Sequence, residues 1–136
     1  MERFGISKKV VWAGIVLILL TGLIHLIDAP SSFDDATYKG ILFVVNGIGA
    51  AVAALGIYRG ARTWGWGLGL LIAGGSLVGY IISRTVGLPG LGPDDWLEPL
   101  GIASLIVEAA YVWFALQALA GADARPRTAV GSLEEL

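Results

Sequence analysis

Four long runs with few or no charged residues dominate this sequence, at residues 10–27, 40–58, 64–83 and 97–119. A helix needs about 17 to 25 predominantly apolar residues to cross roughly 30 Å of hydrocarbon, so each run is long enough to span a membrane. Strands of a membrane barrel alternate apolar and polar residues over about ten positions, which these runs do not do. The charged fraction is 15%, whereas a water-soluble domain carries about a quarter. The sequence therefore predicts an all-α, polytopic membrane protein.

The predicted organisation is one domain over residues 1–120, built as an antiparallel bundle of four transmembrane helices, and a flexible cytoplasmic tail over 121–136. The helices are expected at about 10–27, 38–58, 64–84 and 97–119. A cleaved signal peptide is an alternative for the first run, because a basic stretch precedes it. Its apolar core is long for a signal peptide and no A-x-A cleavage pattern follows it, so we expect this helix to be retained.

The distribution of basic residues predicts the orientation. If both termini are cytoplasmic, seven of the nine Lys and Arg residues lie inside, namely Arg3, Lys8, Lys9, Arg59, Arg62, Arg125 and Arg127. Cytoplasmic segments of membrane proteins carry such an excess, and Trp and Tyr gather at both interfaces. The aromatic residues expected at the interfaces are Trp12, Tyr58, Trp64 and Trp66 inside, and Tyr38, Tyr80 and Trp96 outside. We predict a multi-pass protein of the cell membrane with both termini cytoplasmic.

The predicted loops differ in length. A tight inner turn over 58–63 makes the second and third helices antiparallel neighbours. The outer loops, over 28–37 and from residue 84 to 95, are longer and acidic, and each carries an Asp-Asp pair before a helix.

Glycines in the second and third helices predict where helices pack closely. Gly75 and Gly79 form a small-xxx-small pattern, and Gly47 lies among small residues of the second helix. One interpretation is that these glycines let the second and third helices pack within one bundle. The other is that one glycine face receives a second protomer or another subunit, which predicts a homo-oligomer or a membrane complex.

Polar residues at membrane depth predict an intramembrane site. Glu108 lies 11 residues after Leu97, about 16 Å down at 1.5 Å per residue. A charged side chain at that depth costs about 2.5 to 3.5 kcal/mol, so we expect an unpaired Glu108 to be neutral. Asn46, Ser76 and Ser104 reach a similar depth and could form one polar layer with Glu108. These groups could instead serve only as hydrogen-bonded glue between helices.

A second polar group is predicted nearer the outer face, where it would form the mouth of the bundle. Its members are His25, Asp28, Tyr80, Arg84 and Glu98. An ion pair from Arg84 to Glu98 or Asp28 would close this mouth, and Asp28 could orient His25, whose charge changes near neutral pH. Alternatively, Glu98 satisfies backbone amides in a capping box that begins at Asp95, and Arg84 extends to lipid headgroups.

Composition removes several classes of function. The chain has no Cys, one His and one Met, so it lacks the ligands for iron–sulfur clusters, soft metals or haem within one chain, and we expect no metal and no cofactor. Scattered basic residues and a net charge of −2 argue against nucleic acid. Glu98 and Glu108 are about 15 Å apart along a helix, too far for paired-carboxylate chemistry, so an enzyme is the least favoured class.

The segment Ser83-Arg84-Thr85-Val86-Gly87-Leu88-Pro89-Gly90, followed by Glu98-Pro99 and Glu108, resembles a group of small four-helix membrane proteins of archaea and bacteria. Those proteins also carry a His near the end of the first helix, as His25 does here. The resemblance covers most of the chain. It implies the four-helix architecture and a single site containing His25, Arg84, Glu98 and Glu108, but it implies no activity.

Two functional hypotheses follow. In the first, an outward-opening polar site binds or conducts a proton, a cation or a small polar ligand, with Glu108 as the buried acid. In the second, the protein is a non-catalytic accessory or interaction subunit of a larger membrane complex, and its polar residues hold the helices together.

Overall fold

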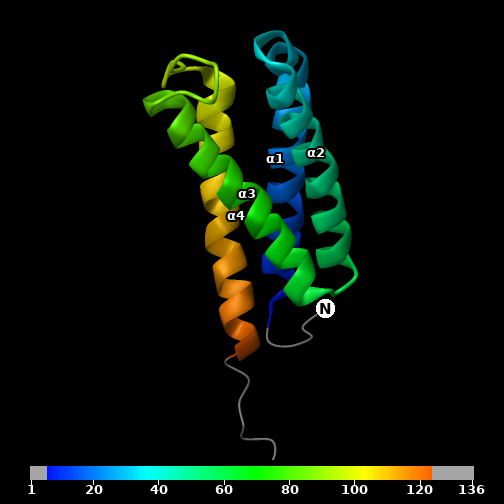
Figure 1. Cartoon of the computed structure of the whole chain (residues 1–136). Coiled ribbons are helices and arrows are strands. Elements are labelled where there is room, and N and C mark those ends of the chain that lie inside the picture. Colours follow the sequence, from blue (N-terminus) through cyan, green and yellow to red (C-terminus); the bar gives the residue numbers. More distant parts are fainter. Residues whose placement is uncertain (1–5, 124–136) are drawn as a thin grey trace, which may run out of the picture.

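The computed structural model describes residues 6–123, which form four α-helices joined by short connections (Figure 1). The helices are α1 (Lys8–Asp35), α2 (Thr37–Tyr58), α3 (Arg62–Thr85) and α4 (Pro99–Asp123). Each helix is long and apolar enough to cross a membrane, which confirms the all-helical prediction with four candidate spans. Arg3, Arg125, Arg127 and the predicted tail beyond residue 123 lie outside the described residues.

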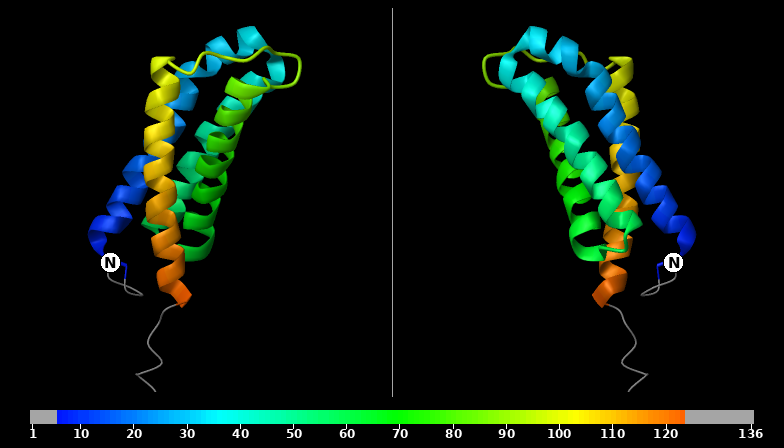
Figure 2. Two further views of the ribbon diagram at one scale, coloured as in Figure 1. Left: turned by 90° about the vertical axis from the view of Figure 1, so that its left-hand side faces the viewer. Right: turned by 90° about the vertical axis from the view of Figure 1, so that its right-hand side faces the viewer.

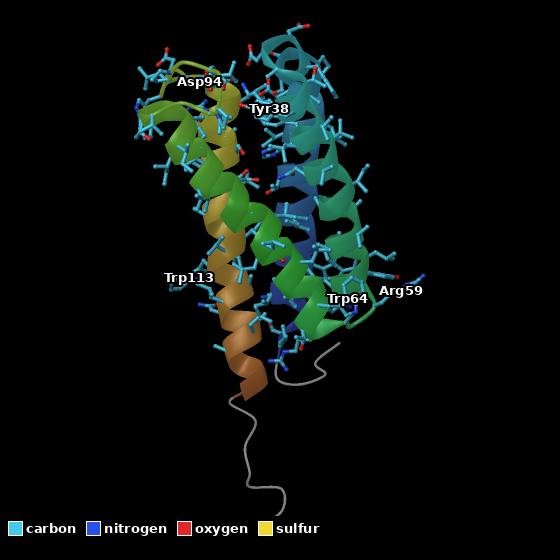
Figure 3. The ribbon with its side chains drawn as sticks, in the orientation of Figure 1. Tyr38, Arg59, Trp64, Asp94 and Trp113 are labelled. Carbon is cyan, nitrogen blue, oxygen red and sulfur yellow. The ribbon has the colours of Figure 1, made fainter. Side chains whose placement is uncertain are left out.

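The four helices form a ring in which each helix packs against the next and α4 packs against α1. The α1–α2 and α3–α4 connections lie at one end of the bundle, and the α2–α3 connection lies at the other with the start of α1 (Figures 1 and 2). Figure 3 labels Asp94 at the first end and Arg59 at the second, so we call them the Asp94 end and the Arg59 end.

Helix α1 is longer than predicted, because residues 28–35 are helical rather than the start of a loop. Pro30 lies within this helix, although proline removes a backbone donor and usually ends a helix. Burial of Ala29 and Ser32 holds the segment in helical form, since packing of one face supplies most helical stability. Ala36 alone separates α1 from α2, and its N–H donates to the Ser32 carbonyl at 3.1 Å.

Local sequence signals explain the other helix ends. The Ser7 side chain accepts a hydrogen bond from the Val10 N–H at 3.3 Å and caps α1. Gly60 ends α2 in the left-handed region, at φ +79°, where glycine avoids the steric penalty of a Cβ atom. Helix α4 begins at Pro99, in the first turn where a missing N–H costs nothing.

Two stacked aromatic rings lie in the core of the bundle on the side of the Arg59 end. Trp66 and Tyr111 are 1% and 0% exposed, and their rings stack with centroids 5.8 Å apart. The Tyr111 hydroxyl donates to the Trp66 carbonyl at 3.1 Å. A Cβ atom at Gly14 would overlap the Trp66 ring, and one at Gly69 would overlap the Tyr111 hydroxyl. Trp66 therefore belongs to the core, not to the interface where the sequence predicts it.

Only some of the glycines predicted to pack lie at a helix contact. Gly65 of α3 lies against α2, where an added Cβ atom would be 2.7 Å from the Ile57 nitrogen and 2.8 Å from the Gly56 carbonyl carbon. Gly47 packs against Leu26 of α1 instead of α3. A Cβ atom at Gly75 or Gly79 would meet nothing within 4 Å, so these two glycines are not at a helix contact within the bundle.

Candidate functional site

Glu108 lies in the middle of α4 and is 1% exposed. Its Oε1 accepts a hydrogen bond from the Ser104 hydroxyl, one helical turn earlier, at 2.5 Å. Its Oε2 is buried without a hydrogen-bond partner among the described residues. The predicted contact between Ser104 and Glu108 is therefore present, and half of the carboxyl group is unsatisfied.

His25 of α1 faces Glu108 of the neighbouring helix α4. Its Nδ1 lies 2.8 Å from the Thr21 carbonyl oxygen, and because a carbonyl only accepts, Nδ1 must carry the hydrogen. In the neutral ring Nε2 is then an acceptor, and it lies 3.7 Å from Glu108 Oε1. His25 is 9% exposed, so the structure places it in the buried site and not in the outer mouth. Thr21, rather than Asp28, orients its ring.

The His25–Glu108 contact joins two acceptors in a buried place. A neutral Nε2 and a carboxylate oxygen repel each other, whereas one added proton on either atom makes the contact attractive. The ring of Phe43, from α2, packs against the His25 ring, and the two centroids are 4.9 Å apart. The arrangement therefore favours uptake of one proton or another positive charge.

Asn46 and Ser76 form a second, separate pair. The Asn46 side-chain amide donates to the Ser76 hydroxyl at 2.7 Å, and Ser76 donates to the Ile72 carbonyl at 2.8 Å. This pair joins α2 to α3, whereas the Ser104–Glu108–His25 group joins α4 to α1. The four residues of the predicted polar layer thus form two groups without a hydrogen bond between them in the described part of the chain.

Arg84 organises the Asp94 end. Its guanidinium lies 3.2 Å from the Glu98 carboxylate and 3.7 Å from that of Asp94. It also lies over the Tyr80 ring, 4.0 Å from the centroid, and only 10% of its side chain is exposed. The predicted Arg84–Glu98 pair and the predicted proximity of Tyr80 are both present. Arg84 is held by protein groups and does not extend to the surface.

The capping box that the sequence offers as an alternative role for Glu98 is present only in part. The Asp95 side chain accepts a hydrogen bond from the Leu97 N–H at 3.0 Å, but the Glu98 carboxylate turns to Arg84. The Tyr80 hydroxyl donates to the Trp96 carbonyl at 3.1 Å, which ties α3 to the segment before α4.

Lys39 and Asp94 belong to this end, and the sequence reasoning missed both. Lys39 Nζ lies 2.6 Å from Asp35 and 4.0 Å from Asp94, so Asp94 lies between two basic side chains, Lys39 of α2 and Arg84 of α3. The Tyr38 hydroxyl donates to the Pro89 carbonyl at 2.6 Å, so the α3–α4 connection reaches across to the start of α2 (Figures 2 and 3). One feature of the sequence could have pointed to Lys39: it and Arg84 are the two basic residues predicted on the outer side of the membrane.

Asp28 is half-buried on α1, and the structure shows no hydrogen bond or ion pair for it within residues 6–123. The charges that act on its carboxyl group are those of Glu98, Lys39, Asp35 and Arg84. Asp28 therefore lies among the charged groups of the Asp94 end without direct pairing.

The described residues contain no group of three His, Asp or Glu side chains placed to hold a metal ion. The chain matches no family model, no curated protein and no solved structure. Its function must therefore be inferred from the site itself.

Proposed function

We propose that the four helices cross the cell membrane as an antiparallel bundle, with the Arg59 end and both termini cytoplasmic. Lys8, Lys9, Arg59 and Arg62 lie in or beside the elements of the Arg59 end, and the positive-inside rule assigns that end to the cytoplasm. At the other end, Lys39 and Arg84 are paired with carboxylates, so they add little positive charge there. The many exposed apolar side chains along the helices, such as Leu71 at 72% and Trp113 at 63%, suit contact with lipid.

We propose further that the protein binds a proton or another small cation at Glu108 and His25, from the outer side. The observation that carries this proposal is the pair of acceptors that face each other across 3.7 Å in a buried place, beside an unpartnered Glu108 Oε2. Ionisable residues at membrane depth are costly and usually functional. A single added positive charge removes the repulsion within the pair and satisfies one of its acceptors.

Binding is favoured over conduction across the whole membrane. On the side nearer the cytoplasm, Trp66 and Tyr111 stack within a packed apolar core and leave room only for glycine at two contact points. The carboxylates at the Asp94 end favour access from outside, because negative charge at a mouth concentrates protons and cations. We therefore propose a site that opens outward and is closed on the inner side.

The Glu108→Gln variant tests this function. Gln preserves size and can accept from Ser104, but it cannot take up a proton. In lipid nanodiscs, a drop in pH should produce the infrared C=O band of a protonated carboxyl group in the native protein, and this band should be absent in Glu108→Gln. Asp34→Asn, at an exposed position of α1, is the matched control and should keep the band. An identical band in Glu108→Gln and native protein would exclude Glu108 as the binding group.

An accessory or interaction subunit is the second candidate, and the open glycines of α3 favour it. Gly74, Gly75 and Gly79 have nothing within 4 Å of an added Cβ atom, although small residues in membrane helices usually mark close helix contacts. We propose a second copy of this chain as the occupant of that face. A native mass measurement from membrane extract distinguishes a monomer, a homo-oligomer and a complex with another subunit.

A further inference from the structure

Asp28 lies between the Asp94 end and the buried pair. It follows His25 by three residues, so both side chains lie on the same face of α1, about 4.5 Å apart along the axis. His25 is buried and Asp28 is half-buried, which makes Asp28 the more accessible of the two.

The other carboxylates near this end have direct partners, apart from the exposed Asp34. Asp35 and Asp94 lie within 4.0 Å of Lys39, and Glu98 lies 3.2 Å from Arg84. Asp95 accepts a backbone N–H. Asp28 has no such hydrogen bond or ion pair within residues 6–123, so its carboxyl group can gain or lose a proton without breaking one.

The surrounding charges come from every element packed around Asp28. They are Lys39 of α2, Arg84 of α3, Glu98 just before α4, and Asp35 of α1 itself, and Asp94 lies between the two basic residues. Three carboxylates already outnumber the two basic groups, so an ionised Asp28 adds to an excess of negative charge. Such an excess attracts protons and cations to the place where Asp28 lies.

On the premise of the proposed function, we propose that Asp28 is the carboxyl group through which protons pass between the outer solution and the His25–Glu108 pair. A proton on the Asp28 carboxyl passes to His25 Nε2 through bridging water, because no Asp28 oxygen lies within 4.0 Å of a His25 nitrogen. The transfer leaves an Asp28 carboxylate and an imidazolium ring. The ring passes a proton from Nε2 to the Glu108 carboxylate and returns to its neutral form, with Nδ1–H still donated to Thr21. The Asp28 carboxylate then takes the next proton from water at the mouth.

The remaining groups around the pair do not offer this route. Lys39 and Arg84 are each held by carboxylates, and the Phe43 ring, which packs on His25, carries no exchangeable proton. On the other side, the stacked Trp66 and Tyr111 rings close the bundle toward the Arg59 end. Asp28 is thus the titratable group that follows His25 on α1 toward the Asp94 end and that has no hydrogen bond or ion pair within residues 6–123.

The test measures the rate and the extent of Glu108 protonation separately, by time-resolved infrared spectroscopy after a pH jump in nanodiscs. Asp28→Asn should slow the appearance of the Glu108 carboxyl band by about tenfold or more, since a positioned acid or base contributes at least that much to proton transfer. The final amplitude of the band should stay within a factor of two of the native value. Asp28→Glu should restore the rate, and Asp34→Asn should leave it unchanged.

The outcomes separate this inference from its premise. A native rate in a folded Asp28→Asn variant overturns the role of Asp28 and leaves Glu108 as the binding group. A band that is unaffected by Glu108→Gln overturns both. If Asp28→Asn fails to fold, Asp28→Glu and Asp28→Ser supply the comparison, and equal rates in these two variants overturn the role of Asp28.

Discussion

Ser104 is the side chain that donates a hydrogen bond to Glu108 within the described residues, and this bond can be tested alone. We expect Ser104→Ala to lower the free energy of unfolding by about 0.5 to 1.5 kcal/mol, the net contribution of a typical hydrogen bond in a protein. Unfolding in mixed detergent micelles, followed by loss of helical signal, measures the change. In a Glu108→Leu background the same substitution should cost much less, and an equal cost in both backgrounds would contradict a specific bond.

Substitution of Arg84 tests the contacts at the Asp94 end, because its planar guanidinium group makes contacts that a Lys cannot reproduce. Arg84 lies over Tyr80, approaches two carboxylates and donates to the Asp95 carbonyl at 3.2 Å. We expect Arg84→Lys to destabilise the protein by about 1 kcal/mol and to speed amide hydrogen exchange in the α3–α4 connection. Arg59→Lys, at an exposed position, should change stability by less than about 0.5 kcal/mol. Equal effects of the two substitutions would disprove a particular role for Arg84.

The spacing of residues predicted the contact within α4 and the Arg84–Glu98 pair, but it did not place His25 beside Glu108. The one-turn spacing of Ser104 and Glu108 predicted their hydrogen bond, because residues four apart share a helix face. His25 was assigned to the mouth because its helix was expected to end at residue 27. Since α1 continues to Asp35, His25 lies deeper than that assignment allows. The depth of a polar residue thus depended on a helix end that the sequence placed eight residues too early.

Two glycines of α3 give a matched comparison at the level of the helix contact. Gly65→Ala places a Cβ atom 2.7 Å from the backbone of α2, and backbone cannot move aside as a flexible side chain can. We expect it to destabilise the protein by about 1 to 3 kcal/mol. Gly75→Ala meets open space, and because Ala favours helix we expect it to be neutral or slightly stabilising. Equal losses of stability by the same unfolding assay would contradict the observed α2–α3 contact.

The existence of the four helices was predictable, but their contacting faces were not. Long apolar runs specify a spanning helix by length and composition alone, so four spans followed directly. A helix that is apolar on all sides carries no periodic polar face to show which side packs inward. Gly47, Gly75 and Gly79 therefore indicated where a close helix contact is possible, but not which helix makes it. Of these three, only Gly47 lies at a helix contact in the bundle. Pro30 was misleading because proline usually ends a helix, whereas here burial of the residues around it keeps the segment helical.

The orientation of the whole molecule can be tested directly, because the chain contains no cysteine. A single cysteine at position 59 lies in the α2–α3 connection, and one at position 92 lies in the α3–α4 connection. In intact cells, a membrane-impermeant thiol reagent should label Gly92→Cys at once and Arg59→Cys only after the membrane is permeabilised. Both positions are exposed, so burial will not prevent the reaction. The reverse pattern of labelling would invert the proposed topology.

The depth of Glu108 has an electrical consequence. It lies nine residues after the start of α4, about 14 Å along the helix, which is close to half of the roughly 30 Å hydrocarbon thickness. Carrying one charge across the whole membrane is worth about 2.3 kcal/mol per 100 mV. In the proposed orientation, a proton that reaches Glu108 from outside would therefore respond to about half of the membrane voltage. A potential that is negative inside would favour the bound proton by about 1 kcal/mol per 100 mV. The occupancy of one carboxyl group would then follow both external acidity and voltage, the two quantities that together make up a proton-motive force.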